Sequence, residues 1–437
     1  MIYLDHHATT PVLPEVWEAM RPYMSEVFGN PSSAHAFGRK ARQALEDARE
    51  RIAPLLGAFP DEVIFTSGAT EANNLAIFGL AGDPPGHILA SPIEHPCVIE
   101  PLKQLAARGF EIEWLPVQHN GSVAIEALTE RVRPQTRLIA LMLVNHETGA
   151  VQPVGLEPLV ASRTSAKPQA AFHTDAAQAV GKIPVDFHAL GVTTLSLSGH
   201  KFGAPKGIGA LLLKRGTKLR PQLYGGHQQQ GRRPGTEPVA LAVGLATALA
   251  CASAVAPSDS KNPEPDAQRG RGALLGCVAP SDSKNPEPDA QRGRGTLLAL
   301  ATRRARVDGH PGDCAGSEQV FALRLRLLDQ LRTAVPPIVV NSPDNGSPYV
   351  LNVSFPGCRA DLLLMKLDLL GVACSTGSAC SSGSLLPSPV LQAMGVADEV
   401  LRSAMRFSFS SSTSDQEIDE AAQHIIKSVK DLRTVQT

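Results

Sequence analysis

Several polar side chains that could take part in catalysis directly follow apolar, strand-like segments of this chain. Lys201 is the most informative of them. The segment SLSGHKFGAPKGIGA places Ser198, His200 and Lys201 at the end of an apolar run. Ligands of open α/β sheets bind outside the carboxyl ends of the strands. A partly shielded lysine there can lose its proton and form a Schiff base with a carbonyl compound. Taken alone, such a lysine is more often an ordinary surface residue.

A carboxylate follows the preceding apolar segment. HTDAAQAVGK places Asp175 and Gln178 at the end of that segment. A pyridoxal phosphate ring needs an acid beside its pyridine nitrogen, because the protonated ring is the better electron sink. A single Asp at a strand end is usually a turn or cap residue, but together with Lys201 it indicates a site for this cofactor.

Two further segments supply groups that suit the same cofactor. FTSGATEANN puts Ala69 and Thr70 at the start of a helical run, where free backbone N–H groups and the helix dipole favour a phosphate. SPIEHPCV puts His95 after another strand-like run, where its ring can stack on a cofactor. Alone, these segments read equally well as an ordinary helix start and a loop histidine.

The stretch CSTGSACSSGS holds two thiols of different character. Cys374 follows an apolar run and is most simply a buried strand residue, whereas Cys380 lies among Gly and Ser. Such neighbours give conformational freedom, so Cys380 is expected to be a nucleophile on a loop that moves. The seven cysteines of the chain are scattered, which predicts reduced thiols rather than a disulfide scaffold.

The segments between these residues predict an α/β fold. Short runs such as DEVIFTS, HILAS and RLIALMLVN alternate with helical runs such as PCVIEPLKQLAARG, which is typical of a mainly parallel sheet covered on both faces. Ser32 and Ser33 are expected to start an amphipathic helix whose apolar face consists of Leu45, Ala48, Ile52 and Leu55. Four parts are predicted: an N-terminal segment at 1–15 that joins the small domain, a large domain at 16–252, an insertion at 253–312 and a small α+β domain at 313–437.

The insertion contains an exact repeat. VAPSDSKNPEPDAQRGRG occurs at 255–272 and again at 278–295. A polar, Pro-rich segment has no apolar face to stack, so a disordered surface insertion is expected.

The composition of the chain limits the classes of partner that are expected. The 41 basic and 42 acidic residues leave a formal charge of -1, which gives no electrostatic reason to expect nucleic acid or a membrane surface as a partner. No run is apolar enough to span a bilayer, and the N-terminus does not resemble a signal peptide, so the cytoplasm is expected.

Seven segments together resemble the cysteine desulfurases of the class V aminotransferase family. They are YLDHHATTP, GNPSS, FTSGATE, HTDAAQAVGK, SGHK, RRPGTE and GSACSSGS, in the family's order. The resemblance implies a homodimer with the aspartate-aminotransferase-like fold (PLP fold type I): a large domain with a mainly parallel, seven-stranded mixed sheet and a smaller α+β domain. It also implies that pyridoxal phosphate helps to convert L-cysteine to L-alanine, with sulfur left as a persulfide on Cys380, in the branch with a long mobile loop.

The resemblance also assigns roles by position. Lys201 matches the Schiff-base lysine, Cys380 the catalytic cysteine, and His95 the stacking histidine, which is expected to carry protons because imidazole titrates near neutral pH. The other matches are Asp175 for the pyridine nitrogen, Gln178 for the ring hydroxyl, Ala69, Thr70, Ser198 and His200 for the phosphate, Thr236 for the phosphate of the second subunit, and Asn30 and Arg406 for the substrate carboxylate. The implied sulfur acceptor is an iron-sulfur scaffold protein or a tRNA-thiolation enzyme.

Two stretches depart from the family pattern. His146 stands where the family usually has a second Asn that contacts the cofactor ring, and its flat ring is expected to tilt the cofactor. His227, Gln229 and Gln230 replace a glycine and an acid-base pair in the stretch expected to approach the partner's cofactor.

Other functions stay open at this point. A zinc site at Asp5–His7 or at the Cys374 and Cys380 pair does not match structural zinc spacing, so no metal is expected. Selenocysteine lyase and other class V activities use the same cofactor residues. A non-catalytic sulfur scaffold is disfavoured because Lys201, Asp175 and Cys380 are all present.

Overall fold

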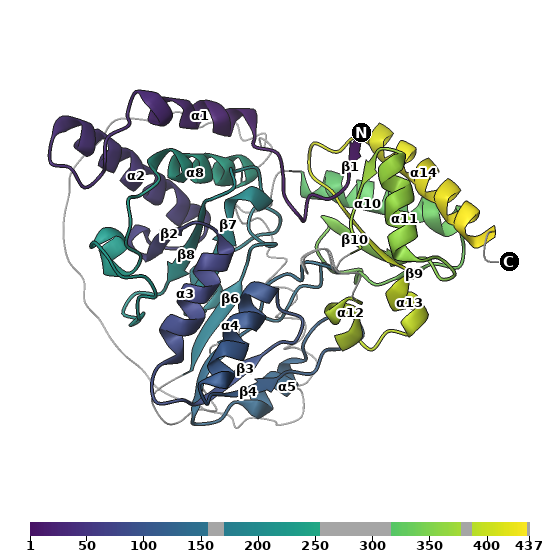
Figure 1. The fold of residues 1–437 in the computed structure, drawn as a ribbon, viewed down its shortest axis with the longest axis horizontal. Helices are drawn as coiled ribbons and strands as arrows, with labels where there is room; N and C mark the ends of the chain where they lie inside the picture. The colour runs from purple at the N-terminus through teal and green to yellow at the C-terminus, as the bar shows by residue number, and fades with distance from the viewer. Residues whose placement is uncertain (156–169, 254–315, 377–386, 435–437) are drawn as a thin grey trace, which may run out of the picture. The chain divides into compact units, whose positions relative to one another are not determined.

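The computed structural model describes residues 1–155, 170–253, 316–376 and 387–434 (Figure 1). Almost all of the predicted insertion and the candidate nucleophile Cys380 therefore lie outside the described residues.

Helices in the described residues are α1 (Pro14–Ser25), α2 (Ala36–Leu55), α3 (Ala69–Ala81), α4 (Pro96–Ala107), α5 (Ile125–Arg131), α7 (Phe187–Leu190), α8 (Val239–Ser253), α10 (Ser317–Ala334), α11 (Ala360–Leu369), α12 (Pro389–Ala393), α13 (Asp398–Arg402) and α14 (Asp415–Thr434). Short 3-10 turns are η1 (Pro60–Glu62), η2 (Gly199–Lys201) and η3 (Gln228–Gly231). Strands are β1 (Ile2–Tyr3), β2 (Val63–Thr66), β3 (His87–Ala90), β4 (Glu111–Trp114), β5 (Thr136–Ala140), β6 (Ala171–Asp175), β7 (Thr194–Ser198), β8 (Gly209–Leu213), β9 (Val339–Val340), β10 (Val350–Ser354), β11 (Val372–Ala373) and β12 (Ala404–Ser408).

A seven-stranded sheet organises the first part of the chain. Its order is β2-β8-β7-β6-β5-β3-β4, and only β8 runs antiparallel to its two neighbours. The other pairs are parallel, so β3, β5, β6 and β7 all end at one edge. The predicted mainly parallel, mixed sheet of seven strands is confirmed.

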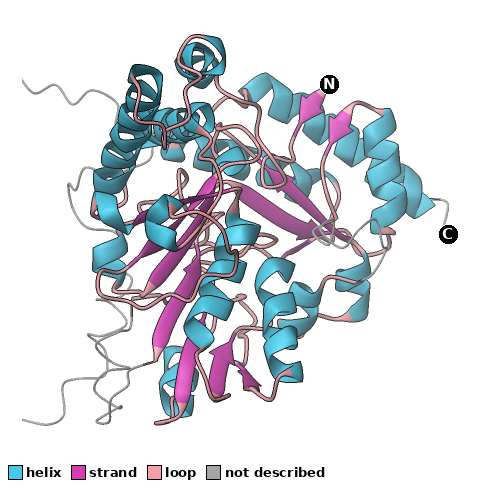
Figure 2. Ribbon diagram, turned by 60° about the vertical axis from the view of Figure 1, so that its left-hand side comes forward, coloured by secondary structure: helices cyan, strands magenta, loops and turns pink. Residues whose placement is uncertain are grey.

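Both faces of this sheet are buried, which explains why its strands are continuously apolar. In β2, Phe65 packs into a core with α2 and α8, whereas its neighbour Ile64 packs with Ala72 and Leu75 of α3 on the opposite face. The same alternation in β3 directs Ile88 towards α4. Figure 2 shows the strands as a central layer with helices on either side.

The helix expected after Ser32 and Ser33 starts later than predicted. The structure begins α2 at Ala36, and His35 is the N-cap, where its Nδ1 accepts a hydrogen bond from Gly38 N at 3.3 Å. The serines lie in a preceding turn, in which Ser33 N donates to Asn30 O at 3.0 Å. The predicted apolar face is confirmed: Leu45, Ala48 and Ile52 belong to the core of the large sheet, and the partly buried Leu55 packs against it.

A second core surrounds an antiparallel sheet with the order β12-β10-β9. The N-terminal residues Ile2 and Leu4 belong to this core, and β1 pairs in parallel with β11. His7 then lies against the loop after β5, because its Nδ1 is 3.2 Å from His146 O. The N-terminal segment therefore connects both cores, while the predicted domain boundaries stay a prediction.

Candidate functional site

Four parallel strands bring the candidate residues to one edge of the large sheet. Asp175 ends β6 and Lys201 follows β7, while His95 follows β3 and His146 follows β5. This is where an open α/β sheet binds its ligands. Figure 1 shows β3, β6 and β7, which are far apart in the sequence, within one sheet.

Lys201 is held by the N-terminal segment. Its Nζ donates to the carbonyl oxygens of His7 at 2.7 Å and Ala8 at 3.0 Å. The short turn η2 directly after β7 places this amine, and Gly199 within the turn is buried. The side chain of Lys201 is half-buried, as expected for an amine that must be shielded and yet reach a ligand.

Asp175 is a buried carboxylate that is held through both of its oxygen atoms. Its Oδ1 accepts from Ala177 N at 2.9 Å, and its Oδ2 accepts from Asn73 Nδ2 at 2.7 Å. The carboxylate is therefore fixed in orientation at the strand end, as a partner for a ring nitrogen would have to be.

Gln178 is also oriented through both of its polar atoms. Its Nε2 donates to His7 O at 2.9 Å, and its Oε1 accepts from the buried Lys182 Nζ at 2.5 Å. Burial holds the pKa of Lys182 well below its usual range, with the nearby Lys201 and Arg406 acting in the same direction. Among the described residues, the second N–H of the Gln178 amide has no hydrogen-bond partner, and its contact with a ring hydroxyl stays a prediction.

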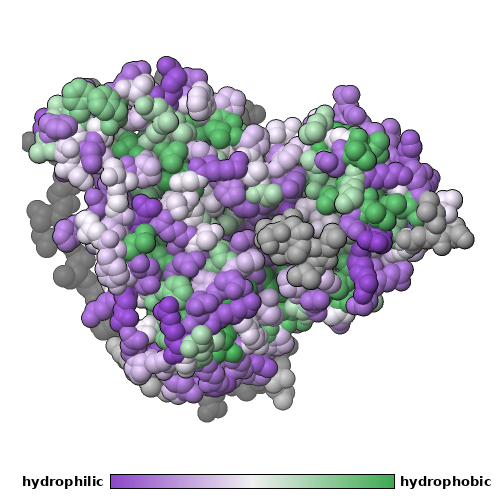
Figure 3. Space-filling model, viewed as in Figure 1, coloured by the Kyte–Doolittle hydropathy of each residue, from purple (hydrophilic) through white to green (hydrophobic). Residues whose placement is uncertain are grey.

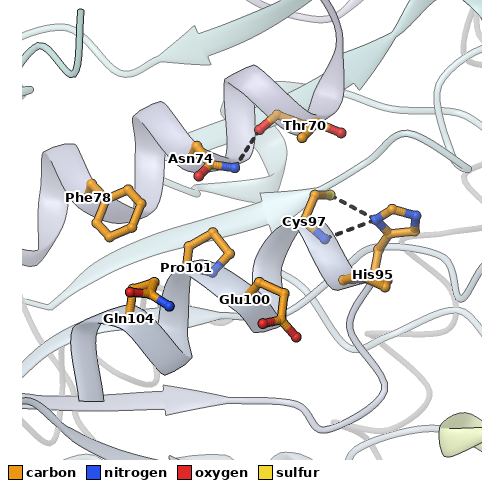
Figure 4. A pocket seen from close by; sticks show the side chains of 9 residues that line it. Thr70, Asn74, Phe78, His95, Cys97, Glu100, Pro101 and Gln104 are labelled. Atoms are coloured by element: carbon orange, nitrogen blue, oxygen red, sulfur yellow. Dashed lines mark hydrogen bonds between the residues drawn. The ribbon is translucent and has the colours of Figure 1, made fainter. Parts of the chain in front are cut away.

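His95 caps α4 and lines a pocket between α3 and α4. The pocket, of about 440 Å³, also involves Thr70, Cys97 and Phe78 (Figure 4). His95 Nδ1 lies 2.9 Å from Cys97 Sγ and accepts the backbone N–H of Cys97 at 3.2 Å. Burial lowers the pKa of His95, although the nearby Asp175 opposes this effect.

The predicted phosphate turn lies at the start of α3. Gly68 precedes the helix with φ 154°, which favours glycine, and an added Cβ there would lie 3.4 Å from Ser198 Oγ. Gly209 of β8 is equally constrained, because its Cβ would meet Gly68 Cα at 2.7 Å. Two glycines thus bring Ser198 beside the helix start that carries Ala69 and Thr70.

Arg406 is a fully buried guanidinium beside the same group of residues. Its Nη2 forms an ion pair with Asp5 Oδ1 at 2.9 Å, and its Nη1 donates to His146 O at 3.0 Å. The backbone of Arg406 forms a β-bridge with Ser375 on one side. On the other side, β12 pairs with β10, and Asn352 lies opposite Arg406. Arg406 is therefore rigidly placed.

Two predicted residues are not brought into this group, and a third cannot be placed. Asn30 uses its side-chain Oδ1 in a local turn, where it accepts from Ser32 N at 2.9 Å. Thr236 is exposed on the loop between η3 and α8, and within the described residues it has no hydrogen bond to the group. Cys380 lies outside the described residues. The roles of all three stay predictions.

Three further histidines beside the site have lowered pKa values. Burial and then Lys201 lower the pKa of His200 to about 4, and its Nδ1 lies 3.1 Å from Thr9 Oγ1. Burial lowers the pKa values of His7 and His146 well below the usual range. His146 presents its ring edge-on to His95, with 5.4 Å between centroids.

Unpartnered nitrogen atoms mark the site as built for a polar ligand. Among the described residues, His7 Nε2, His146 Nδ1 and Arg406 Nε are buried without a hydrogen-bond partner. Leaving such groups unpaired is costly unless a ligand or water meets them. Together with the amine of Lys201 and the carboxylate of Asp175, this donor set fits pyridoxal phosphate and an amino-acid carboxylate.

Sequence reasoning missed a second layer of residues that supports these groups. Asp175 is contacted by Asn73, which in turn contacts His173. His95 is contacted by Cys97, and Gln178 by Lys182. Asn73, His173 and Lys182 stand within or beside the quoted motifs, but residue type and spacing alone gave them no role, because their partners come from other strands.

A separate cluster has the composition of a metal site. In the described residues, His87, Glu111 and Glu113 offer ligand atoms within 4.8 Å of one another. Their carboxylates already pair with Arg131 and Arg133, so the cluster is an ion-pair network at the other end of β3 and β4.

Comparison with known proteins identifies the family. The pattern described as Aminotransferase class-V matches residues 2–266. Cysteine desulfurase IscS of Dictyoglomus turgidum is 37% identical over 99% of this chain and 96% of that protein. The mitochondrial cysteine desulfurase of Drosophila melanogaster is 38% identical over 99% of this chain and 81% of that protein. The chain belongs to the cysteine desulfurases of the class V aminotransferase family.

Solved structures agree with this assignment. A NifS-like protein superimposes with a TM-score of 0.77 at 30% identity, covering 98% of each chain. A structure described as SspA in complex with cysteine has a TM-score of 0.69 at 31% identity, covering 94% of this chain and 99% of the other. As a cysteine desulfurase, this is a pyridoxal-phosphate-dependent enzyme with the type I fold, and both predictions are confirmed.

The structure also bears on membrane association. Among the described helices, none is both long and apolar enough to cross a bilayer.

Proposed function

We propose that this desulfurase converts L-cysteine to L-alanine and transfers the sulfur to its own Cys380 as a persulfide. The observation that carries the proposal is the placement of Lys201, Asp175 and His95 at one sheet edge, beside the buried Arg406. Bound there, pyridoxal phosphate would supply an electron sink for the α-carbon of the substrate.

The residues proposed to hold the cofactor are those that the family resemblance assigns, and the positions of most of them at the sheet edge support the assignment. The start of α3, with Ala69 and Thr70, would receive the phosphate together with Ser198 and His200. Asp175 would contact the pyridine nitrogen, Gln178 the ring hydroxyl, and His95 the face of the ring. Thr236 would reach the phosphate of the partner subunit.

Arg406 and Lys201 would act on the substrate. The guanidinium would bind the carboxylate, a task for which its planar fork is suited, with Asn30 as a second carboxylate contact from its own or the partner subunit. The amine of Lys201 would take the proton from the α-carbon and later return a proton to the three-carbon product. Lys201 is thus the base whose position the N-terminal segment fixes through two carbonyl groups.

Cys380 would act on the sulfur. Its thiolate attacks the sulfur of the substrate, so that an S–S bond forms while the C–S bond breaks, and the three-carbon fragment takes up a proton and leaves as alanine. The described residues on either side of Cys380 support this role. Ser375 pairs with the backbone of Arg406, and Ser388 Oγ lies 2.5 Å from Glu147 Oε2 beside His146.

The remaining parts of the proposal concern the oligomeric state, the sulfur acceptor and the cellular compartment. A homodimer is proposed because apolar side chains gather on α1, α2 and the loop between them (Figure 3): Trp17 is 58%, Met24 64%, Phe28 69% and Phe37 53% exposed. We propose an iron-sulfur scaffold protein or a tRNA-thiolation enzyme as the sulfur acceptor, and the cytoplasm as the compartment.

Product analysis of purified variants tests the function. Wild-type protein with L-cysteine and a reducing thiol should release alanine and sulfide in equal amounts, with L-selenocysteine as a parallel substrate. Cys380→Ala and Lys201→Ala should lose at least about 100-fold in rate, since each removes a group that acts in the reaction. Cys374→Ala and Lys206→Ala are the matched controls. Full activity of Cys380→Ala would refute the assignment of the nucleophile.

A further inference from the structure

A chain of buried polar groups lies behind His95 and Asp175, and the proposed reaction does not use it. Asn73 of α3 is 0% exposed, His173 of β6 is 1% exposed and Cys97 of α4 is 9% exposed. Buried polar groups are costly unless each one is paired. The contacts among these residues therefore carry information about where their hydrogen atoms lie.

Asn73 stands at the centre of the chain. Its Nδ2 donates both hydrogens, one to Asp175 Oδ2 at 2.7 Å and one to Cys97 Sγ at 3.0 Å. Its Oδ1 lies 2.9 Å from His173 Nε2. The carboxylate requires the amide nitrogen on its side, so His173 must be the donor to Oδ1.

The same reasoning places the hydrogen of His173. With Nε2 protonated and the ring neutral, Nδ1 accepts, and Thr194 Oγ1 lies 2.9 Å away as its donor. Burial lowers the pKa of His173 to about 4, which agrees with a neutral ring. Every group from Thr194 to Cys97 thereby has one consistent arrangement of donors.

Cys97 continues this arrangement to His95. The backbone N–H of Cys97 donates to His95 Nδ1 at 3.2 Å, so that this nitrogen carries a lone pair (Figure 4). Cys97 Sγ lies 2.9 Å from the same nitrogen and already accepts from Asn73. The S–H has two acceptors within reach, this nitrogen and Asp175 Oδ2 at 3.9 Å, and the shorter contact directs the hydrogen at the lone pair of His95. Two donors therefore converge on Nδ1.

We propose that Cys97, oriented by Asn73, is a positioning residue that keeps His95 in the tautomer with its hydrogen on Nε2. This rests on the proposed function, in which His95 lies over the cofactor. His95 then offers an N–H donor to the reacting groups, and it takes up a proton only by breaking the two contacts at Nδ1. The expected role of His95 as a proton carrier becomes that of a hydrogen-bond donor, suited to an anionic sulfur.

Other charged and titratable groups also face His95. They are Asp175 from β6, Lys201 from η2 and His146 from the loop after β5. Because Cys97 carries no charge of its own, a variant at this position changes the hydrogen bond to Nδ1 and leaves those three groups in place. Cys97→Ser retains a donor, whereas Cys97→Ala removes it.

Nitrogen NMR of protein labelled with ¹⁵N-histidine tests the proposal without turnover. In wild type and in Cys97→Ser, the His95 signals should show a lone pair on Nδ1 and a hydrogen on Nε2. In Cys97→Ala, the pH at which His95 protonates should rise by about 0.5 unit, because a donor to the lone pair is lost. Cys251→Ala in α8 is the matched control, and thermal unfolding confirms that each variant is folded.

Two results would overturn the inference. One is a hydrogen on Nδ1 of His95 in the wild-type protein. The other is an identical titration of His95 in Cys97→Ala and Cys251→Ala. Neither depends on the nucleophile, so failure here is distinguishable from failure of the proposed reaction, which the Cys380→Ala assay decides.

Discussion

At the scale of single residues, Arg406 shows how a buried charge is prepared for a ligand. Asp5 compensates part of its charge, and the carbonyl of His146 orients one end of the guanidinium. Its Nε has no partner among the described residues. A buried cation with an open donor is costly unless it serves binding, so the substrate carboxylate is the natural partner.

Arg406→Lys should raise KM for L-cysteine by about 10- to 100-fold, because lysine cannot make a two-pronged contact with a carboxylate. Steady-state kinetics at several cysteine concentrations measures this. The control is Arg402→Lys, at an exposed arginine of α13. An unchanged KM in Arg406→Lys would exclude Arg406 from carboxylate binding.

At the scale of elements, the loop after β5 is tied to α12 through Glu147. Glu147 is buried, and Ser388, which caps α12 through Leu391 N at 3.0 Å, lies against its carboxylate. Burial raises the pKa of Glu147 from 4.5 to about 7. The folded protein therefore binds this proton more tightly than the unfolded chain, so this group's contribution to stability falls as pH rises from about 4.5 to 7.

Glu147→Gln should remove this dependence. Relative to wild type, the variant should gain about 2 kcal/mol in unfolding free energy between pH 5 and pH 7, because glutamine has no proton to lose. Urea denaturation at the two pH values gives the difference, and Glu130→Gln, at an exposed position of α5, serves as the control. A constant difference between wild type and Glu147→Gln would show that Glu147 is ionised in the folded protein throughout this range.

At the scale of the whole molecule, two exposed aromatic residues, in α2 and in the loop before it, indicate an interface with another protein surface. Phe28 and Phe37 are exposed and stack on one another, with 5.5 Å between ring centroids. A contiguous apolar patch of this kind usually marks an interface. A second copy of the chain is the proposed cover, which would also bring Thr236 to the partner's phosphate site.

The double variant Phe28→Ser/Phe37→Ser should weaken the dimer by about 30-fold in Kd, the effect of losing about 2 kcal/mol at an interface centre. Sedimentation of dilute protein measures the change. Leu369→Ser is the control, because Leu369 is 87% exposed on α11, in the other core's helical layer. Equal dissociation constants for the double variant and wild type would place the dimer interface elsewhere.

The sequence by itself determined the fold class and the main candidates for chemistry. Apolar runs alternating with helical segments predict the parallel sheet, and Lys201, Asp175 and His95 stand directly after such runs, so their place at the strand ends follows from local pattern. The sequence pattern does not predict strand order, or the contacts between side chains that depend on strand order.

Only the tertiary structure decided which residues support the site. Asn73 meets Asp175 and Cys97 because α3 packs against β6 and α4, which are distant from it in the sequence. Lys182 and Gln178 meet in the buried turn after β6. It also replaced Ser32 and Ser33 by His35 as the cap of α2, because a cap depends on the path of the preceding turn. Contacts between distant segments have no local periodicity, so no spacing along the chain could have shown them.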